Sequence, residues 1–148
     1  MNLSETLDQI QEQIRSQSSC PSGWTQSGTR CFLFINSDRD WITAERHCIE
    51  LGGNLASFHD YNQLVFLRNL VYSATRSYRN TWVGGTDAVK DGVWFWSDGS
   101  KYDYNNWYRG EPNNAGGPEN CMEINFGGIS TNDERCTSSR PYICSRKR

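Results

Sequence analysis

Side chains whose oxygen atoms could bind a metal gather in two short segments of this 148-residue chain. The first segment runs from Glu111 to Cys121, and the second runs from Thr131 to Cys136. The candidates are Glu111, Asn113, Glu119, Asn132 and Asp133. Carboxylate and amide oxygens are the ligands that calcium prefers, usually about six to eight of them, and neither segment contains a histidine. We therefore predict that these residues together form a calcium site.

The first of these segments is predicted to be a loop, because two prolines and two glycines interrupt any helix or central strand. Loops held by a rigid scaffold often carry binding residues. If Cys121 and Cys136 form a disulfide, their Cα atoms lie about 5.5 Å apart. Glu119 and Asp133, which are close to these cysteines in sequence, would then lie near each other. The alternative is that all these polar side chains are ordinary solvated loop residues.

The composition indicates an extracellular protein. Six cysteines, an even number, suggest three disulfides and an oxidising compartment. A zinc protein is a weaker alternative, because the chain has two histidines and no Cys-x-x-Cys pair. The net charge of -2 gives no electrostatic reason to expect a nucleic-acid partner. No apolar stretch approaches the roughly 20 residues of a membrane span, so we expect a secreted protein.

Residues 1–19 differ from the rest of the chain. Leu3, Leu7, Ile10 and Ile14 are spaced as in a heptad repeat, with polar residues between them. Asn2 followed by Glu5 has the spacing of a capping box, in which each side chain bonds the other's backbone. One interpretation is a helical neck that associates chains into a homo-oligomer. The other is a helix that packs on its own domain or frays, because so short a helix is marginal alone.

Residues 20–148 are predicted to form an α+β domain. We expect helices over Asp40–Leu51 and Asp60–Tyr72, in which apolar residues recur at helical spacing behind an N-terminal aspartate. The expected strands are a hairpin over Trp24–Cys31 that continues through Phe32–Ile35, followed by Thr81–Gly85, Val93–Trp96, Cys121–Phe126 and Pro141–Cys144. Residues 97–120 form a long polar segment, and such segments are usually functional or disordered. Helices followed by strands favour an α+β fold.

Several motifs carry a resemblance to a known family. Glu111-Pro-Asn113, Glu119 ahead of Cys121, and Asn132-Asp133 ahead of Cys136 resemble the C-type lectin-like domain in its sugar-binding form. The similarity extends over residues 20–146 and includes Trp82-Val-Gly84, Trp94–Gly99 and all six cysteines. The chain is most similar to secreted fish lectins of the ladderlectin type and to the related type II antifreeze proteins.

The resemblance implies a fold of two helices flanking antiparallel sheets, with a long calcium-binding loop region. It also implies that the five candidate residues all ligate one Ca²⁺ ion and that sugar hydroxyls bind the same ion. Six cysteines allow 15 pairings, and the resemblance implies Cys20–Cys31, Cys48–Cys144 and Cys121–Cys136. It further implies a cis bond between Glu111 and Pro112, which would let the side chains on either side face one ion.

The order of Glu111 and Asn113 predicts the sugar class. It resembles that of family members that bind mannose-type sugars, meaning mannose, fucose, N-acetylglucosamine or glucose, whose 3- and 4-hydroxyls are equatorial. The reversed order, Gln then Asp, is the galactose form. The alternative function is ice binding, because the type II antifreeze proteins are similar in sequence. Residues 1–19 are expected to be a neck, and residues 20–148 the carbohydrate-recognition domain.

The sequence departs from the family pattern at two places. Thr131 stands where the family has a packing tryptophan, which bears on how the core is filled. Asn114 and Asn120 are amides where members with a second calcium site have acids, and Asp87 and Asp91 could still contribute. With fewer charged ligands, we expect this second site to be weak or absent.

An enzyme is not expected. His47 and His59 have no evident nucleophile beside them in the sequence. Glu111 and Glu119 could imitate the carboxylate pair of a glycosidase. A cation bound by both would keep them ionised, so that neither could act as an acid.

Overall fold

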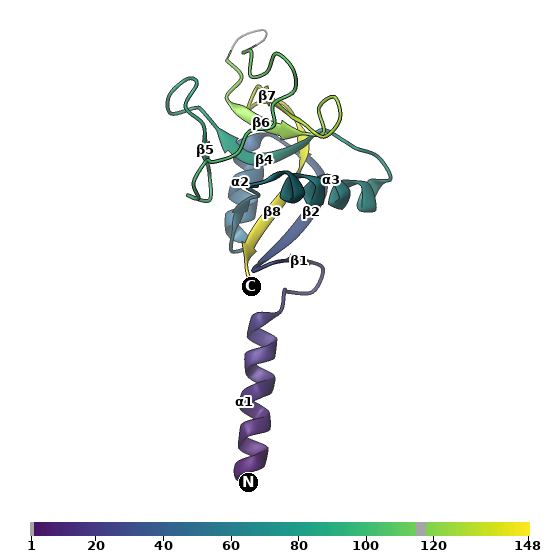
Figure 1. Ribbon diagram of the computed structural model, residues 1–148, viewed down its shortest axis with the longest axis vertical. Helices are drawn as coiled ribbons and strands as arrows, with labels where there is room; N and C mark the ends of the chain where they lie inside the picture. The colour runs from purple at the N-terminus through teal and green to yellow at the C-terminus, as the bar shows by residue number, and fades with distance from the viewer. Residues whose placement is uncertain (1, 115–117) are drawn as a thin grey trace.

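The computed structural model describes residues 2–114 and 118–148, and over residues 12–18 it describes the backbone alone. A long N-terminal helix, α1 (Leu3–Ser18), extends away from a rounded body that contains all the other elements (Figure 1). The later part of the long polar segment and the loops between the last strands lie at the end of the body farthest from α1 (Figure 1). No helix in the described part of the chain is long and apolar enough to cross a membrane.

One eight-stranded sheet forms the body, with its main path in the order β1-β2-β8-β4-β6-β7. Its strands are β1 (Thr25–Ser27), β2 (Arg30–Arg39), β3 (Asn54–Leu55), β4 (Thr81–Thr86), β5 (Phe95–Trp96), β6 (Cys121–Ile124), β7 (Thr131–Glu134) and β8 (Arg140–Lys147). The strands pair antiparallel except β4 and β8, which meet in parallel at Trp82 and Tyr142. The α+β prediction is thus confirmed, with one mixed sheet where antiparallel sheets were expected.

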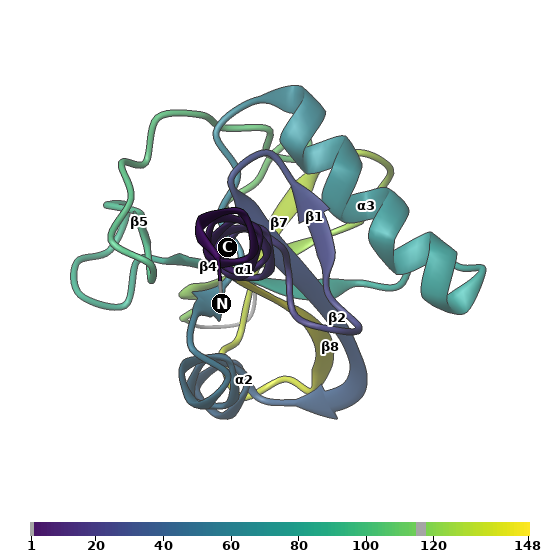
Figure 2. The same cartoon turned by 90° about the horizontal axis from the view of Figure 1, so that it is seen from below.

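The two helices of the body begin where the sequence predicted. Helix α2 (Trp41–Glu50) and helix α3 (Tyr61–Thr75) each start after an aspartate, Asp40 or Asp60, whose side chain accepts from a backbone N–H of the first turn. Helix α3 runs three residues beyond its predicted end at Tyr72, and Arg76 in a left-handed conformation stops it. The two helices lie on opposite sides of the strands β2 and β8 (Figure 2).

Each helix covers its own part of an aromatic core. Helix α3 buries Leu64, Leu67 and Val71 in a cluster that contains Trp94 and Trp96. On the other side of the sheet, helix α2 buries its apolar residues around Trp82 and Tyr142. Buried indole groups also bond the backbone, since Nε1 of Trp82 donates to the Arg39 carbonyl at 2.9 Å. Trp82 therefore contributes both buried apolar area and a fixed hydrogen bond.

Three disulfides close the body, and all three predicted pairings are confirmed. They join Cys20 to Cys31, Cys48 to Cys144, and Cys121 to Cys136, with Cα–Cα distances of 5.5, 5.2 and 5.2 Å. The second of them ties helix α2 to strand β8 across 96 residues of sequence. The third joins the ends of the two segments that carry the candidate ligands.

The long polar segment is fixed to the body by its aromatic residues. Trp107 forms a parallel bridge with Thr131, and its ring lies 4.8 Å from that of Trp94, centroid to centroid. Thr131 is fully buried, and its backbone bonds the chain at Asn106 and Tyr108. The family has a packing tryptophan where this chain has the smaller Thr131. Here the loop at Trp107 covers that position.

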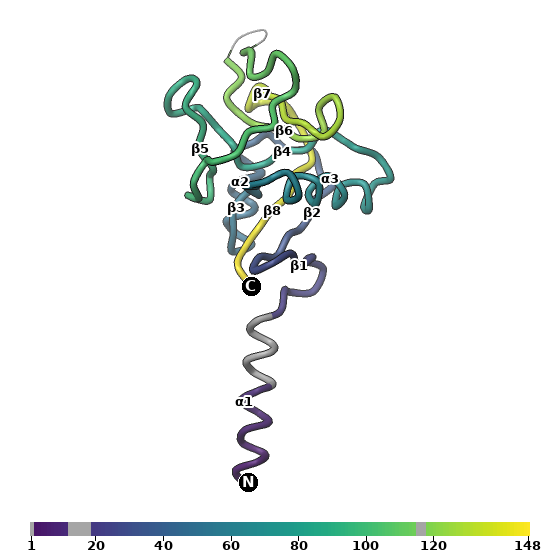
Figure 3. The backbone as a smooth tube through the Cα atoms, in the orientation of Figure 1, coloured from purple at the N-terminus to yellow at the C-terminus, as the bar shows by residue number. Residues whose placement is uncertain are grey.

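Helix α1 presents its apolar residues to solvent. The predicted capping box is confirmed, with the Asn2 side chain accepting from the Glu5 N–H at 2.8 Å. Leu3, Leu7 and Ile10 are 75%, 50% and 47% exposed, while the side chain of Ile14 lies outside the described part. The helix extends away from the body (Figure 3), so packing on its own domain is not what supports it. We propose that residues 1–19 are a neck, separate from the domain of residues 20–148, and that it associates with other copies of the chain.

Replacing apolar residues of this seam is expected to dissociate the oligomer. Leu7→Ser combined with Ile10→Ser removes two buried contacts per helix, so the full chain should become monomeric in light scattering after gel filtration. The control is Asp8→Ser with Gln9→Ser, which alters the polar face of the same helix and should leave the mass unchanged. A wild-type chain that is monomeric at every concentration would contradict the proposed neck.

Candidate functional site

Three carboxylates from two segments meet at the loop end of the body. One oxygen of each of Glu111, Glu119 and Asp133 lies within 4.8 Å of the others. Glu119 precedes β6 and Asp133 lies on β7, and the two strands are paired with Met122 opposite Asp133. The Cys121–Cys136 disulfide holds the same two strands together. The structure therefore brings together the acidic residues that the sequence analysis selected.

Asp133 fixes the loop that carries the other ligands. Its side chain is 1% exposed, and its two oxygens accept from the backbone N–H groups of Asn113 at 3.0 Å and Asn114 at 2.9 Å. The Asn113 side-chain amide in turn donates to Oε1 of Glu111 at 2.7 Å. The intervening Glu111–Pro112 bond is cis, as predicted. Glu111 and Asn113 therefore lie side by side at the surface, directly above a buried carboxylate.

The three neighbouring carboxylates are arranged so that a bound positive ion would be more favourable than three ionised carboxylates without one. Burial, together with a hydrogen bond and negative charge from Asp133 and the charge of Glu119, raises the pKa of Glu111 to about 7. Oxygen Oε2 of Glu111 is buried and has no hydrogen-bond partner in the described part of the chain. A buried acceptor without a donor is costly, and a cation at this point would satisfy it. The chemistry of the residues thus fits the predicted calcium ion.

Asn132 is oriented by a part-buried ion pair that the sequence analysis did not identify. Its Nδ2 donates to Glu123 at 2.9 Å, and the other oxygen of Glu123 accepts from Nε of Arg140 at 2.9 Å. Since a carboxylate paired with arginine only accepts, the amide nitrogen of Asn132 must face Glu123. Its oxygen Oδ1 then points away from Glu123, as a metal ligand requires. A glutamate within the apolar run of β6 was the only sequence signal for this role.

A second acidic group adjoins the first. Asp87 is buried, and its Oδ2 accepts from the Gly92 N–H at 2.9 Å while its Oδ1 has no partner among the described residues. Burial and the charges of Asp91 and Asp133 raise the pKa of Asp87. Both ends of the Asn114 amide are already in use, on Asp91 at 3.1 Å and on the Glu119 N–H at 3.3 Å. That a second calcium site is weak or absent here stays a prediction.

The structure also places a serine, a histidine and an aspartate in a row near the start of α3. Nδ1 of His59 lies 2.8 Å from Asp103, and its Nε2 lies 3.4 Å from Oγ of Ser57. The Ser57 hydroxyl, however, donates to Asp98 at 2.5 Å. The hydroxyl proton of Ser57 therefore points away from His59. For Ser57 to act as a nucleophile, His59 would have to accept that proton. This row holds the entry to α3 in place and is not arranged for catalysis.

Changing Glu123 should impair calcium binding without touching a ligand. In Glu123→Gln the amide can turn either way, so Asn132 is no longer forced to present its oxygen, and calcium affinity should fall about 10- to 100-fold in calorimetric titration. The control is Glu134→Gln, because Glu134 also pairs with Arg140, at 3.1 Å, and does not bond Asn132. Circular dichroism with chelator would verify that both variants fold. Equal calcium affinity in the two variants would refute the orienting role.

Comparisons with known proteins agree with this arrangement. Residues 37–146 match the family model described as Lectin C-type domain. The galactose-specific lectin nattectin of Thalassophryne nattereri is 46% identical, over 89% of this chain and 83% of its own length. Ladderlectin of Oncorhynchus mykiss is 50% identical, over 85% of this chain and 67% of its own.

A solved structure extends the likeness to three dimensions. The type II antifreeze protein of herring superimposes with a TM-score of 0.81 at 33% identity, and the match covers 87% of this chain and 99% of that one. The matching family and the relatives named here are lectins rather than enzymes, which confirms the prediction that the chain is not an enzyme. On this evidence the chain belongs to the C-type lectin domain family.

Proposed function

We propose that this protein binds carbohydrate through one calcium ion. The observation that carries the proposal is the group of three carboxylates at the loop end, in which one buried Glu111 oxygen has no donor among the described residues. The ion would be held by Glu111, Asn113, Glu119, Asn132 and Asp133, the set selected from the sequence. Bound calcium would accept adjacent sugar hydroxyls as further ligands. The relatives named as lectins support sugar as the ligand class.

We further propose a preference for mannose-type sugars. The carboxylate of Glu111 accepts and the amide of Asn113 donates, and the two groups lie next to each other at the surface. A hydroxyl that can donate to Glu111 while its neighbour accepts from Asn113 would leave no buried polar group unpaired. A wrong arrangement would cost about 1 to 3 kcal/mol per unpaired group. Nattectin, by its name, is galactose-specific, so the sugar class needs a direct test.

Ice binding is the second candidate, favoured by the likeness to the herring antifreeze protein. Ice presents a regular lattice, and a flat, rather apolar surface suits it. The loop end of this body instead carries charged side chains around a buried carboxylate group. This chemistry suits an ion and a sugar better than ice. Freezing-point depression in a cooled droplet would distinguish the two functions.

The setting of the function is proposed to be extracellular and multivalent. Three disulfides suit an oxidising compartment, and the described cysteines are all paired. Association through α1 would place several sugar sites on one assembly. Linked sites raise the overall strength of binding by about 10²- to 10⁴-fold without any new contact.

Calcium should stabilise the fold, and the effect should weaken below about pH 7. Glu111 must be ionised to bind the ion, and its pKa in the ion-free fold is raised to about 7. A raised carboxylate pKa also means that the ion-free fold loses stability as pH rises from the ordinary value of 4.5 to about 7. Both effects make the calcium-induced rise in melting temperature largest in mild alkali and smaller as pH falls through 7.

The measurement is the melting temperature with excess calcium and with chelator, across this pH range. A hundredfold excess over the dissociation constant should add about 2.7 kcal/mol at the upper pH. Glu111→Gln removes the titrating group, so its residual calcium effect should be flatter between these pH values. A melting temperature that chelator never changes would contradict the calcium site.

Free mannose should elute the protein from immobilised mannan better than galactose does. Chelator should release it as well. Glu111→Gln combined with Asn113→Asp reverses acceptor and donor, so this variant should lose mannan binding and admit galactose. Elution of the wild-type protein by galactose in preference to mannose would show that these two residues do not set the preference proposed here.

A further inference from the structure

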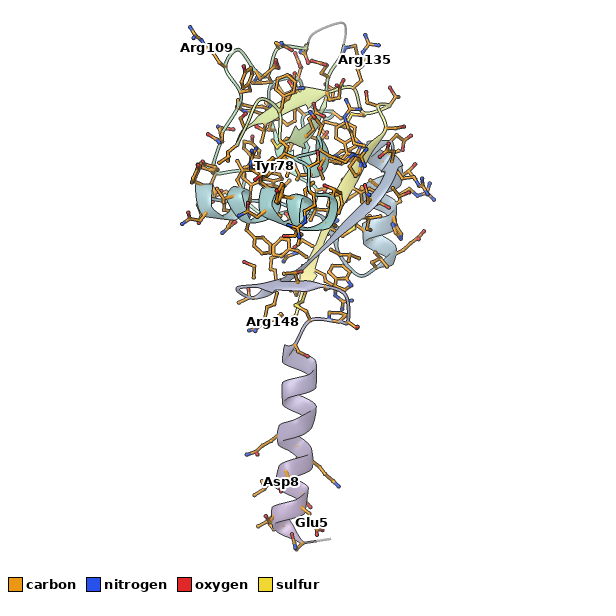
Figure 4. The ribbon with its side chains drawn as sticks, turned by 90° about the vertical axis from the view of Figure 1, so that its right-hand side faces the viewer. Glu5, Asp8, Tyr78, Arg109, Arg135 and Arg148 are labelled. Carbon is orange, nitrogen blue, oxygen red and sulfur yellow. A yellow bond between two sulfur atoms is a disulfide. The ribbon has the colours of Figure 1, made fainter. Side chains whose placement is uncertain are left out.

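A cationic cavity lies at the end of the body from which α1 extends. Its volume is about 550 Å³, and its charged lining residues are Arg30, Asp98, Arg146, Lys147 and Arg148. Four positive side chains thus face a single carboxylate, although the whole chain has a net charge of -2. Arg148 lies at this end of the body, while Arg109 and Arg135 lie at the loop end (Figure 4). The cavity is therefore remote from the proposed calcium site.

The sheet itself forces these cations together. Strands β2 and β8 are paired so that Arg30 lies directly opposite Lys147. Like charges directly opposite each other destabilise a sheet. The Arg148 N–H bonds the Thr29 carbonyl at 3.3 Å, which keeps the last residues beside the β1–β2 turn. Two like charges placed opposite each other in a sheet are unfavourable by themselves. Such a pair is expected at a binding site, where an anionic ligand supplies the opposite charge.

The four cations of the cavity are only partly balanced within it, because the one acidic side chain among the described lining residues, Asp98, attracts Arg30. Nε of Arg30 donates to the Ser145 hydroxyl at 2.8 Å, and Arg146 donates to the Leu51 carbonyl at 3.2 Å, so both partners are neutral. Nε of Arg146 is buried without a partner among the described residues. Asp98 is occupied by Ser57 and Ser100. None of the four cations forms an ion pair in the described part of the chain.

The floor of the cavity is open and polar. Gly52, Gly53 and Gly99 line it together with Asn54 and Ser100. At Gly52, where φ is +91°, a Cβ would come within 3.3 Å of the Arg146 guanidinium group, so the glycine leaves that cation room. Among the residues that the structure describes, no apolar side chain lines the cavity. A ligand that is both anionic and rich in hydroxyl groups fits such a lining.

We propose that this cavity binds a sulfated sugar unit of an acidic polysaccharide, without calcium. Guanidinium groups pair with sulfate through parallel hydrogen bonds, and the cavity is large enough for more than a bare ion. An anionic membrane is the less suitable partner, because helix α1 extends from the same end (Figure 4). At about 1.5 Å per residue, its 16 residues would hold a flat bilayer away, whereas a flexible polymer can reach the cavity.

The test is binding of the full chain to heparin in the presence of chelator. The exposed pair Lys147→Ser and Arg148→Ser should weaken heparin binding about tenfold at low salt, because two contacts to sulfate are lost. The matched control is Arg109→Ser with Arg135→Ser, which removes the same charge from the opposite end and should change affinity less than about twofold. Desulfated heparin should bind neither the wild-type chain nor the control variant.

Each other outcome overturns the proposal. Equal weakening in the two double variants would mean that heparin senses overall charge alone. Loss of heparin binding when chelator is added would mean that heparin binds at the calcium loops. Mannan binding is measured separately on the Lys147 and Arg148 variant, so that failure of the proposed cavity can be distinguished from failure of the proposed lectin site. Tighter binding to phosphatidylserine vesicles than to heparin would favour a membrane partner instead.

Discussion

The mutual repulsion of three carboxylates is the constraint on which the loop end depends. One oxygen of each of Glu111, Glu119 and Asp133 lies within 4.8 Å of the others. The paired strands β6 and β7 and a disulfide keep Glu119 and Asp133 close together. Asp133 fixes the loop that carries Glu111 through two backbone N–H groups, so the carboxylates cannot easily separate to relieve the repulsion. Their charge must be balanced by protonation or by a cation. In the proposed calcium site, the covalent and backbone framework would therefore favour a cation, and the loop itself needs little regular structure.

The framework extends from this point through the whole body. The part-buried Glu123–Arg140 pair orients Asn132 and also joins β6 to the start of β8. Strand β8 is then tied to α2 by the Cys48–Cys144 disulfide and to β2 by its long antiparallel register. The same register ends at the cationic cavity. One strand therefore connects the two ends at which ligands are proposed, although the ends share no residues.

Helix starts, and the acidic residues that cluster at the loop end, could be predicted from the sequence because their signals are local. Asp40 and Asp60 cap the helices that follow them, and the carboxylates mark the loop by type alone. The disulfide pairing came from resemblance, since spacing does not select among the alternatives. Strand β7 was missed because Thr131–Glu134 is polar in sequence, although the structure buries its first three residues. The cationic cavity depends on Arg30 and Ser145, which are 115 residues apart, so no local pattern reveals it.

The candidate ligand residues lie apart from the aromatic core, which bears on how the binding specificity of such a protein can evolve. The aromatic clusters around Trp82 and Trp96 contain no candidate ligand. Substitutions at the surface positions Glu111 and Asn113 can therefore alter what is bound while leaving the packing that stabilises the body intact. Selection can explore new ligands at little risk of unfolding. A galactose-specific lectin and an antifreeze protein can then share one scaffold with this chain.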